Sequence, residues 1–219
     1  MVATVDAVKN ARMDEIEAAY TGGTRSAGGA AAQEAACVRY GVLTTGAPLA
    51  DWQKSVLAQL AQTPGAIDDG WLLPSQSPAA LRERRLDFIL SFAPAAVGRA
   101  LGPCARWGVW QFFFGDWRAY RGESDGFWEI VDDAEVATAV LAQLQEDPDA
   151  IRILVEGAIR SHPYRPAATV AELRRRAAHW PGQLCLSLTE GSTACFETET
   201  VRTAAVVRRR RLGARLACA

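Results

Sequence analysis

The chain has 219 residues, a formal net charge of -1 at pH 7 and 49% hydrophobic residues. This length suits one domain with appendages, and a near-neutral charge argues against a nucleic-acid binder, which would carry a strong positive excess. We expect no membrane partner and no signal peptide, because no apolar run reaches the roughly 18 residues of a membrane span. The five cysteines are widely spaced without a CxxC pair, which predicts no zinc site and free thiols in a reducing cytoplasm.

Three parts are predicted along the chain. Residues 1–36 carry a helical apolar stripe followed by a Gly/Ala-rich stretch, which predicts an N-terminal helix and a linker outside the core. Residues 37–200 hold the apolar segments of a globular α/β domain. Residues 201–219 form a basic tail; a solvated terminus is the plainer interpretation of such a charge run, and binding of an anionic partner is the alternative.

Strands and helices alternate in the first half of the central part. The expected elements are a strand at 38–43, a helix at 47–63, a turn-rich segment at 67–78, a helix at 77–86, a strand at 86–92, a helix at 97–106 and a strand at 108–114. Ser77 followed by Pro78 is a typical helix start. The run at 86–92 is almost wholly apolar, as the buried strands of parallel sheets are.

The second half is less regular. Residues 127–131 suit a strand or the start of a helix, residues 136–144 suit either element, and residues 150–159 suit a strand. A helix is expected at 169–184, where Thr169 and Glu172 have the spacing of a capping box. The alternation predicts an α/β, Rossmann-like fold with a mostly parallel sheet and helices on both faces.

The common signatures of catalysis and nucleotide binding are absent from the sequence. There is no GxGxxG after the first strand, no GxxxxGK[ST], no GxSxG and no HExxH. His162 and His179 are the only histidines, and neither has a motif around it, so both are interpreted as structural or exposed. No metal site is predicted.

The segment GVWQFFFGDWRAYRG, residues 108–122, has the density of a functional site. It is a predicted strand that runs into a loop, and ligands bind beyond the carboxyl ends of strands in α/β sheets. Two carboxylates are candidates for chemistry, Asp116 in this loop and Asp149 before the strand at 150–159. For both, the simpler interpretation is a turn residue.

This segment, together with GFWEI and EVATAVLAQLQEDPDAIRILVEG, resembles the formyltransferase family, the group that contains methionyl-tRNA formyltransferase, and more closely a bacterial branch of formyltransferase-like domains. The resemblance extends over residues 38–188 and includes the upstream LDFILSFAP and the downstream HWPGQLCLSL. It implies the formyltransferase fold and transfer of a formyl group from formyl-tetrahydrofolate to an amine. In that family an Asn and a His stabilise the oxyanion, and an Asp governs protonation.

The resemblance places the family's Asn at Gln111, its His at Phe113 and its Asp at Asp149. The amide of Gln111 is one methylene longer than that of Asn, which displaces its donor, and Phe113 can neither donate nor accept a hydrogen bond. The neighbouring branch's second His falls on Phe114. The family's Ser-Leu-Leu-Pro loop is replaced by residues 115–118, and its Gly after the Asp is Ile151.

Several functions stay open on this basis. The first is a formyltransferase-like protein without standard catalysis, whose remnant pocket binds a small ligand. Its expected lining is Phe113, Phe114, Asp116, Trp117, Tyr120 and Trp128, with Arg118 or Arg121 meeting an anionic group. The second is an active N-formyltransferase on an amine of a sugar or natural-product intermediate, with Asp149 as base and Gln111 as donor. The third is a protein-interaction module, and a homo-oligomer is also considered.

Overall fold

The computed structural model describes residues 37–121, 125, 127–162 and 165–203. The predicted N-terminal helix and linker, residues 1–36, lie outside the described residues, and so does residue 204 onward of the basic tail. No helix among the described residues is long and apolar enough to cross a membrane.

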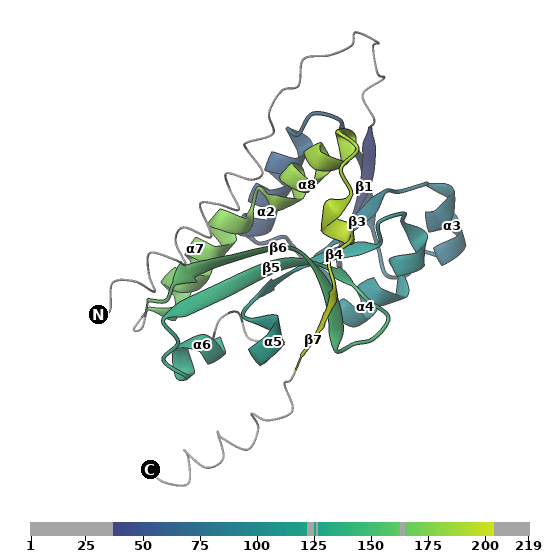
Figure 1. Cartoon of the computed structure of the whole chain (residues 1–219). Helices are drawn as coiled ribbons and strands as arrows, with labels where there is room; N and C mark the ends of the chain where they lie inside the picture. The colour runs from purple at the N-terminus through teal and green to yellow at the C-terminus, as the bar shows by residue number, and fades with distance from the viewer. Residues whose placement is uncertain (1–36, 122–124, 126, 163–164, 204–219) are drawn as a thin grey trace.

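One seven-stranded sheet organises the described chain (Figure 1). Its order is β2 (Ala66–Leu72), β1 (Val38–Leu43), β3 (Phe88–Ser91), β4 (Val109–Phe114), β5 (Val136–Leu144), β6 (Ala150–Arg160) and β7 (Thr200–Arg202). The first four strands pair in parallel, whereas β4 to β7 pair antiparallel. The α/β prediction is confirmed, with a parallel half and an antiparallel extension.

Helices cover both faces of this sheet, as predicted. One face holds α2 (Asp51–Ala61), α7 (Pro166–Ala177), α8 (Trp180–Thr189) and the short helix η2 (Ala194–Phe196). The other holds α3 (Pro78–Glu83), α4 (Ala95–Ala100), η1 (Gly102–Cys104) and α5 (Trp117–Tyr120), and α6 (Phe127–Val131) lies beside α5 (Figure 1). Two separate apolar clusters result, one on each face.

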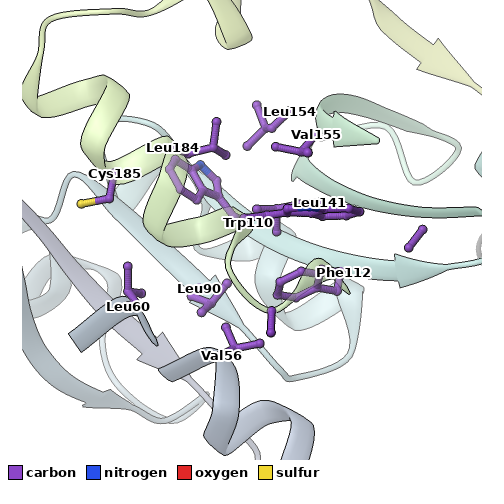
Figure 2. Close-up of a cluster of buried hydrophobic side chains, with 14 of the residues drawn as sticks. Val56, Leu60, Leu90, Trp110, Phe112, Leu141, Leu154, Val155, Leu184 and Cys185 are labelled. Carbon is purple, nitrogen blue, oxygen red and sulfur yellow. The ribbon is translucent and has the colours of Figure 1, made fainter. Parts of the chain in front are cut away.

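Strand β4 contributes to both clusters because successive side chains of a strand point to opposite faces. Trp110 and Phe112 point toward α2 and α8 (Figure 2). Trp110 is fully buried and stacks on Phe88 with ring centroids 3.8 Å apart, while Phe112 meets the edge of Trp52 at 5.8 Å. Gln111 therefore faces the other side, toward α4 and α5.

The expectation of a turn-rich segment at 67–78 is wrong over its first half, because β2 occupies residues 66–72. The strand lies at the edge of the sheet and only Leu72 is fully buried, so its sequence, AIDDGWL, lacks the alternation of a half-buried strand. Gly70 has a φ of +90°, close to a register shift in the pairing with β1. A bulge of this kind obscures the strand pattern in the sequence.

The helix expected at 169–184 is divided into α7 and α8 at Ala178 and His179. Pro181 in the first turn of α8 lacks the N–H that would continue the preceding helix. The prediction of a capping box at Thr169 is wrong, because α7 begins three residues earlier, at Pro166. The Thr169 hydroxyl, fully buried, instead accepts a hydrogen bond from the backbone N–H of His162 at 2.9 Å.

Candidate functional site

The site that the sequence predicts lies on the α4 and α5 face of the central strands. Gln111 pairs across the sheet with Ser91 at the carboxyl end of β3 and with Ala142 of β5. Phe113, two residues further on the same face, pairs with Val140. Both side chains are half-buried. The structure thus brings the positions of the family's Asn and His together at the place where α/β proteins bind ligands.

Phe113 packs against Trp117, the first residue of α5, with ring centroids 4.7 Å apart and an interplanar angle of 62°. Trp117 is only 1% exposed. Between them Gly115 has a φ of +142°, a conformation that a side chain would strain and that turns the chain sharply from strand to helix. An edge-to-face aromatic pair therefore occupies the position at which the family has an imidazole.

Asp116 is the N-cap of α5, so its turn interpretation is confirmed. Its carboxylate accepts hydrogen bonds from the backbone N–H groups of Arg118 at 2.8 Å and Ala119 at 3.3 Å, as capping aspartates do. Its own backbone N–H donates to Oε1 of the buried Glu129 at 2.6 Å. The loop after β4 is therefore held by α6.

Asp149, at which the sequence resemblance places the family's Asp, forms an ion pair with Arg121, with Nη2 and Oδ1 2.9 Å apart. Arg121 is the C-cap of α5 with a φ of +60° and also donates to the Pro148 carbonyl at 3.0 Å. The Asp149 side chain is 53% exposed. The Asp149 carboxylate therefore already has a cationic partner in this arrangement.

A second arginine, Arg99 of α4, holds the same turn between β5 and β6. It donates to the carbonyls of Gln145 at 3.1 Å and Pro148 at 3.0 Å. Burial lowers the pKa of Arg99, and the nearby charge of Arg121 lowers it further. The sequence contains no signal for this contact, because Arg99 and the turn are far apart along the chain.

Arg118 and Tyr120 are engaged with other side chains. Arg118 forms a bidentate salt bridge with Glu156 of β6, with Nη1 2.7 Å from Oε1 and Nη2 3.2 Å from Oε2. This hydrogen bonding raises the pKa of Arg118. Tyr120 is buried, and its hydroxyl donates to Asp132 at 3.2 Å. Neither residue presents a free group to a ligand in this arrangement.

The remaining predicted lining residues, Trp128 and Phe114, lie in different places. Trp128 is half-buried on α6, with its ring 5.2 Å from that of Phe127. The placement of Phe114 in the pocket is wrong: its side chain lies on the opposite face of β4, in the cluster under α2 and α7, 5.1 Å from the ring of Trp52. Strand alternation separates it from Phe113.

Two buried polar atoms on this face have no hydrogen-bond partner among the described residues, Oε1 of Gln111 and Nε1 of Trp117. Buried polar atoms are nearly always paired with protein, water or ligand. One is an acceptor and the other a donor, so they are complementary to a molecule that carries both functions. In the described part of the chain, no three His, Cys, Asp or Glu side chains are close enough to hold a metal ion.

The sheet and this site define a class: a Rossmann-like α/β domain with an aromatic and amide site at the carboxyl end of β3. No protein-family profile and no curated protein sequence match the chain. Solved structures do. Glycinamide ribonucleotide transformylase 1 from Symbiobacterium toebii is 18% identical, with a TM-score of 0.53, over 76% of this chain and 94% of that protein.

Two further structures have the same fold. A variant of HypX from Aquifex aeolicus has a TM-score of 0.55 and 14% identity over 72% of this chain, which spans only 28% of HypX. Methionyl-tRNA formyltransferase from Clostridium thermocellum has a TM-score of 0.51 and 11% identity, over 71% of this chain and 66% of that protein. The chain therefore has the formyltransferase fold, as the sequence resemblance implies.

Proposed function

We propose that this chain is a formyltransferase-fold protein that has lost formyl-tetrahydrofolate-dependent catalysis and that binds a small, planar ligand at the remnant site. We define the remnant site as Gln111, Phe113, Trp117 and Asp149. The observation that carries the proposal is the packing of Phe113 on the buried Trp117, 4.7 Å between centroids. An imidazole at this position would carry a proton donor, whereas the phenyl ring carries none.

The other two positions support the same conclusion. The amide of Gln111 is one methylene longer than that of Asn, which displaces its donor from the place where an oxyanion would be stabilised. Asp149 is paired with Arg121 at 2.9 Å. The carboxylate is engaged with a guanidinium rather than placed to receive a proton from an attacking amine, which argues against acid–base assistance at this position.

These residues do not fit formyl transfer from formyl-tetrahydrofolate. That reaction needs a donor to the formyl oxygen and a group that takes the proton of the amine. Phe113 supplies no donor for the first role, and the carboxylate suited to the second role is engaged by Arg121. We therefore derive no chemical step through this cofactor.

Ligand binding is supported by the two unpartnered atoms, Gln111 Oε1 and Trp117 Nε1. A planar molecule with one donor and one acceptor would satisfy both, and the ring of Phe113 offers it an apolar contact.

The test of lost catalysis is a turnover assay with formyl-tetrahydrofolate and a panel of amines that includes amino sugars. Release of tetrahydrofolate is followed by absorbance, and formylated product by mass spectrometry. We expect no turnover from the wild type. Asp149→Asn and the matched control Asp147→Asn, in the same turn, are assayed in parallel. Turnover that disappears in Asp149→Asn and persists in Asp147→Asn would establish the competing function, an active N-formyltransferase, and overturn the proposal.

The ligand-binding half is tested separately with 5-formyl-tetrahydrofolate, a stable probe that contains a planar pyrimidinone ring, by titration of the intrinsic tryptophan fluorescence. We expect saturable binding that is weakened about tenfold in Gln111→Leu, which removes the polar contact and keeps most of the volume. Unchanged affinity in Gln111→Leu, or no binding of the probe to wild type, would reject the proposal of ligand binding. The proposal of lost catalysis would be unaffected by that result.

A further inference from the structure

A second cleft lies away from the remnant site. It has a volume of about 450 Å³ and is lined by Arg82, Arg85, Leu86, Asp87, Pro103, Cys104, Ala105 and Arg106. The chain enters β3 at Asp87 and approaches β4 through Arg106, and Leu86 pairs with Ala105 in an isolated parallel bridge. The cleft is therefore at the amino ends of these strands, whereas Gln111 pairs with Ser91 at the carboxyl end of β3.

The arginines of this cleft differ from most others in the described chain. Most guanidinium groups elsewhere in the described residues are matched with carboxylates, for example Arg118 with Glu156 and Arg121 with Asp149. Arg82, Arg85 and Arg106 have no ion pair and donate no side-chain hydrogen bond to any described residue.

The fixed surroundings of these arginines leave the cleft positively charged. Asp87 is its one acidic lining residue, and its Oδ2 atom accepts a hydrogen bond from the backbone N–H of Arg39 at 2.8 Å, which directs that oxygen toward β1. The guanidinium of Arg106 lies over the ring of Trp107, 4.9 Å from its centroid. This stacking fixes the plane of Arg106 and leaves its edge to donate.

The rest of the lining is apolar and firmly placed. Leu86 and Cys104 are buried, and the Cys104 thiol donates to the Pro78 carbonyl at 3.6 Å. The cleft therefore combines an apolar wall with cationic side chains from two segments of the chain. A volume near 450 Å³ is in the range of small-molecule sites.

We propose that this cleft binds a small organic phosphate, with Arg82, Arg85 and Arg106 holding the phosphate group and Leu86, Pro103 and Cys104 contacting its organic part. A phosphate monoester presents three terminal oxygens and up to two negative charges, whereas a carboxylate has two oxygens and one charge, so the phosphate accepts from more guanidinium groups at once. Three unpaired guanidiniums around one cleft fit the phosphate better. This site is independent of the proposed function of the remnant site.

The experiment is isothermal titration calorimetry on the full chain with phenyl phosphate, inorganic phosphate and citrate. We expect phenyl phosphate to bind more tightly than inorganic phosphate, because only the ester uses the apolar wall. Citrate is expected to bind more weakly than phenyl phosphate. Citrate binding equal to that of phenyl phosphate would overturn the assignment to phosphate.

The variants Arg82→Gln and Arg106→Gln remove one guanidinium each from two segments of the chain. Each is expected to weaken phenyl phosphate binding about tenfold, as loss of a charged hydrogen bond does. Arg160→Gln is the matched control, because Arg160 is an exposed arginine on β6 that does not line the cleft. An equal loss in Arg160→Gln, or unchanged affinity in both cleft variants with unaltered circular dichroism, would refute the site.

Discussion

Gly98 of α4 gives the sharpest test of the packing beneath the remnant site. A Cβ atom at this position would lie 2.7 Å from Cδ1 of Leu144, 3.2 Å from Cγ1 of Val109 and 3.4 Å from Oγ of Ser91. Carbon atoms in contact are normally about 3.5–4.0 Å apart. Gly98→Ala therefore forces α4 away from β5, and Arg99, the next residue, carries the contacts to the turn at 145–148.

The magnitude follows from two opposing terms. Overpacking by one methyl group in a rigid core costs about 1–3 kcal/mol, whereas replacing Gly by Ala in a helix gains up to about 1 kcal/mol. We expect Gly98→Ala to lower the free energy of unfolding by about 1–2 kcal/mol. Leu144→Val removes the clashing Cδ1 and costs about 1 kcal/mol alone. The double variant should be more stable than the sum of the single effects predicts, by about 1 kcal/mol.

The assay is urea denaturation followed by tryptophan fluorescence, with equal m-values required for comparison. Gly102→Ala is the control, because a Cβ there meets nothing within 4 Å, and its effect should stay within about 0.5 kcal/mol. Additive effects of Gly98→Ala and Leu144→Val, or a loss in Gly102→Ala equal to that in Gly98→Ala, would refute the close contact between α4 and β5.

Three further outcomes follow. Hydrogen bonds from two arginines lower the pKa of Glu172 from 4.5 to about 2. The contribution of Glu172 to stability is therefore present above pH 4.5 and is lost as the pH falls toward 2. We expect the difference in unfolding free energy between wild type and Glu172→Gln to shrink from pH 6 to pH 3. Burial raises the pKa of Cys185 to about 12, so iodoacetamide at pH 8 should label the exposed Cys37 and spare Cys185, as read by peptide mass spectrometry. Trp110→Ala should cost about 3–5 kcal/mol in a denaturant titration, since this side chain is fully buried.

The central strands could be predicted from the sequence, because their burial leaves a strong local pattern of apolar residues. Phe88–Ser91 is buried at every position, which matches a near-continuous apolar run. In β4 the buried pair Trp110 and Phe112 alternates with the half-buried Gln111 and Phe113. Because side chains alternate along a strand, the sequence also indicates that Phe113 faces away from its two aromatic neighbours. The position of Asp116 as a turn residue followed in the same way from local chemistry.

Features that depend on distant contacts could not be derived in this way. Strand β2 exists through pairing with β1 rather than through its own alternation, and only Leu72 of it is fully buried. The clamp of Arg99 on the turn at 145–148 joins segments far apart in sequence. The ion pair between Asp149 and Arg121 likewise joins residues that are distant along the chain. A residue can be assigned a family position from sequence, but its partner is set by the fold.

These contacts bear on whether chemistry could be restored at the remnant site by a single replacement. In Phe113→His the imidazole would lose the apolar contact with Trp117 at 4.7 Å, while Asp149 would stay bound by Arg121 at 2.9 Å. Catalytic groups act as a unit, so restoring one member of a set returns little of the rate. Under the proposed function, a single replacement therefore leaves the other departures in place: Gln111 still stands for the family's Asn, and Asp149 keeps its ion pair with Arg121.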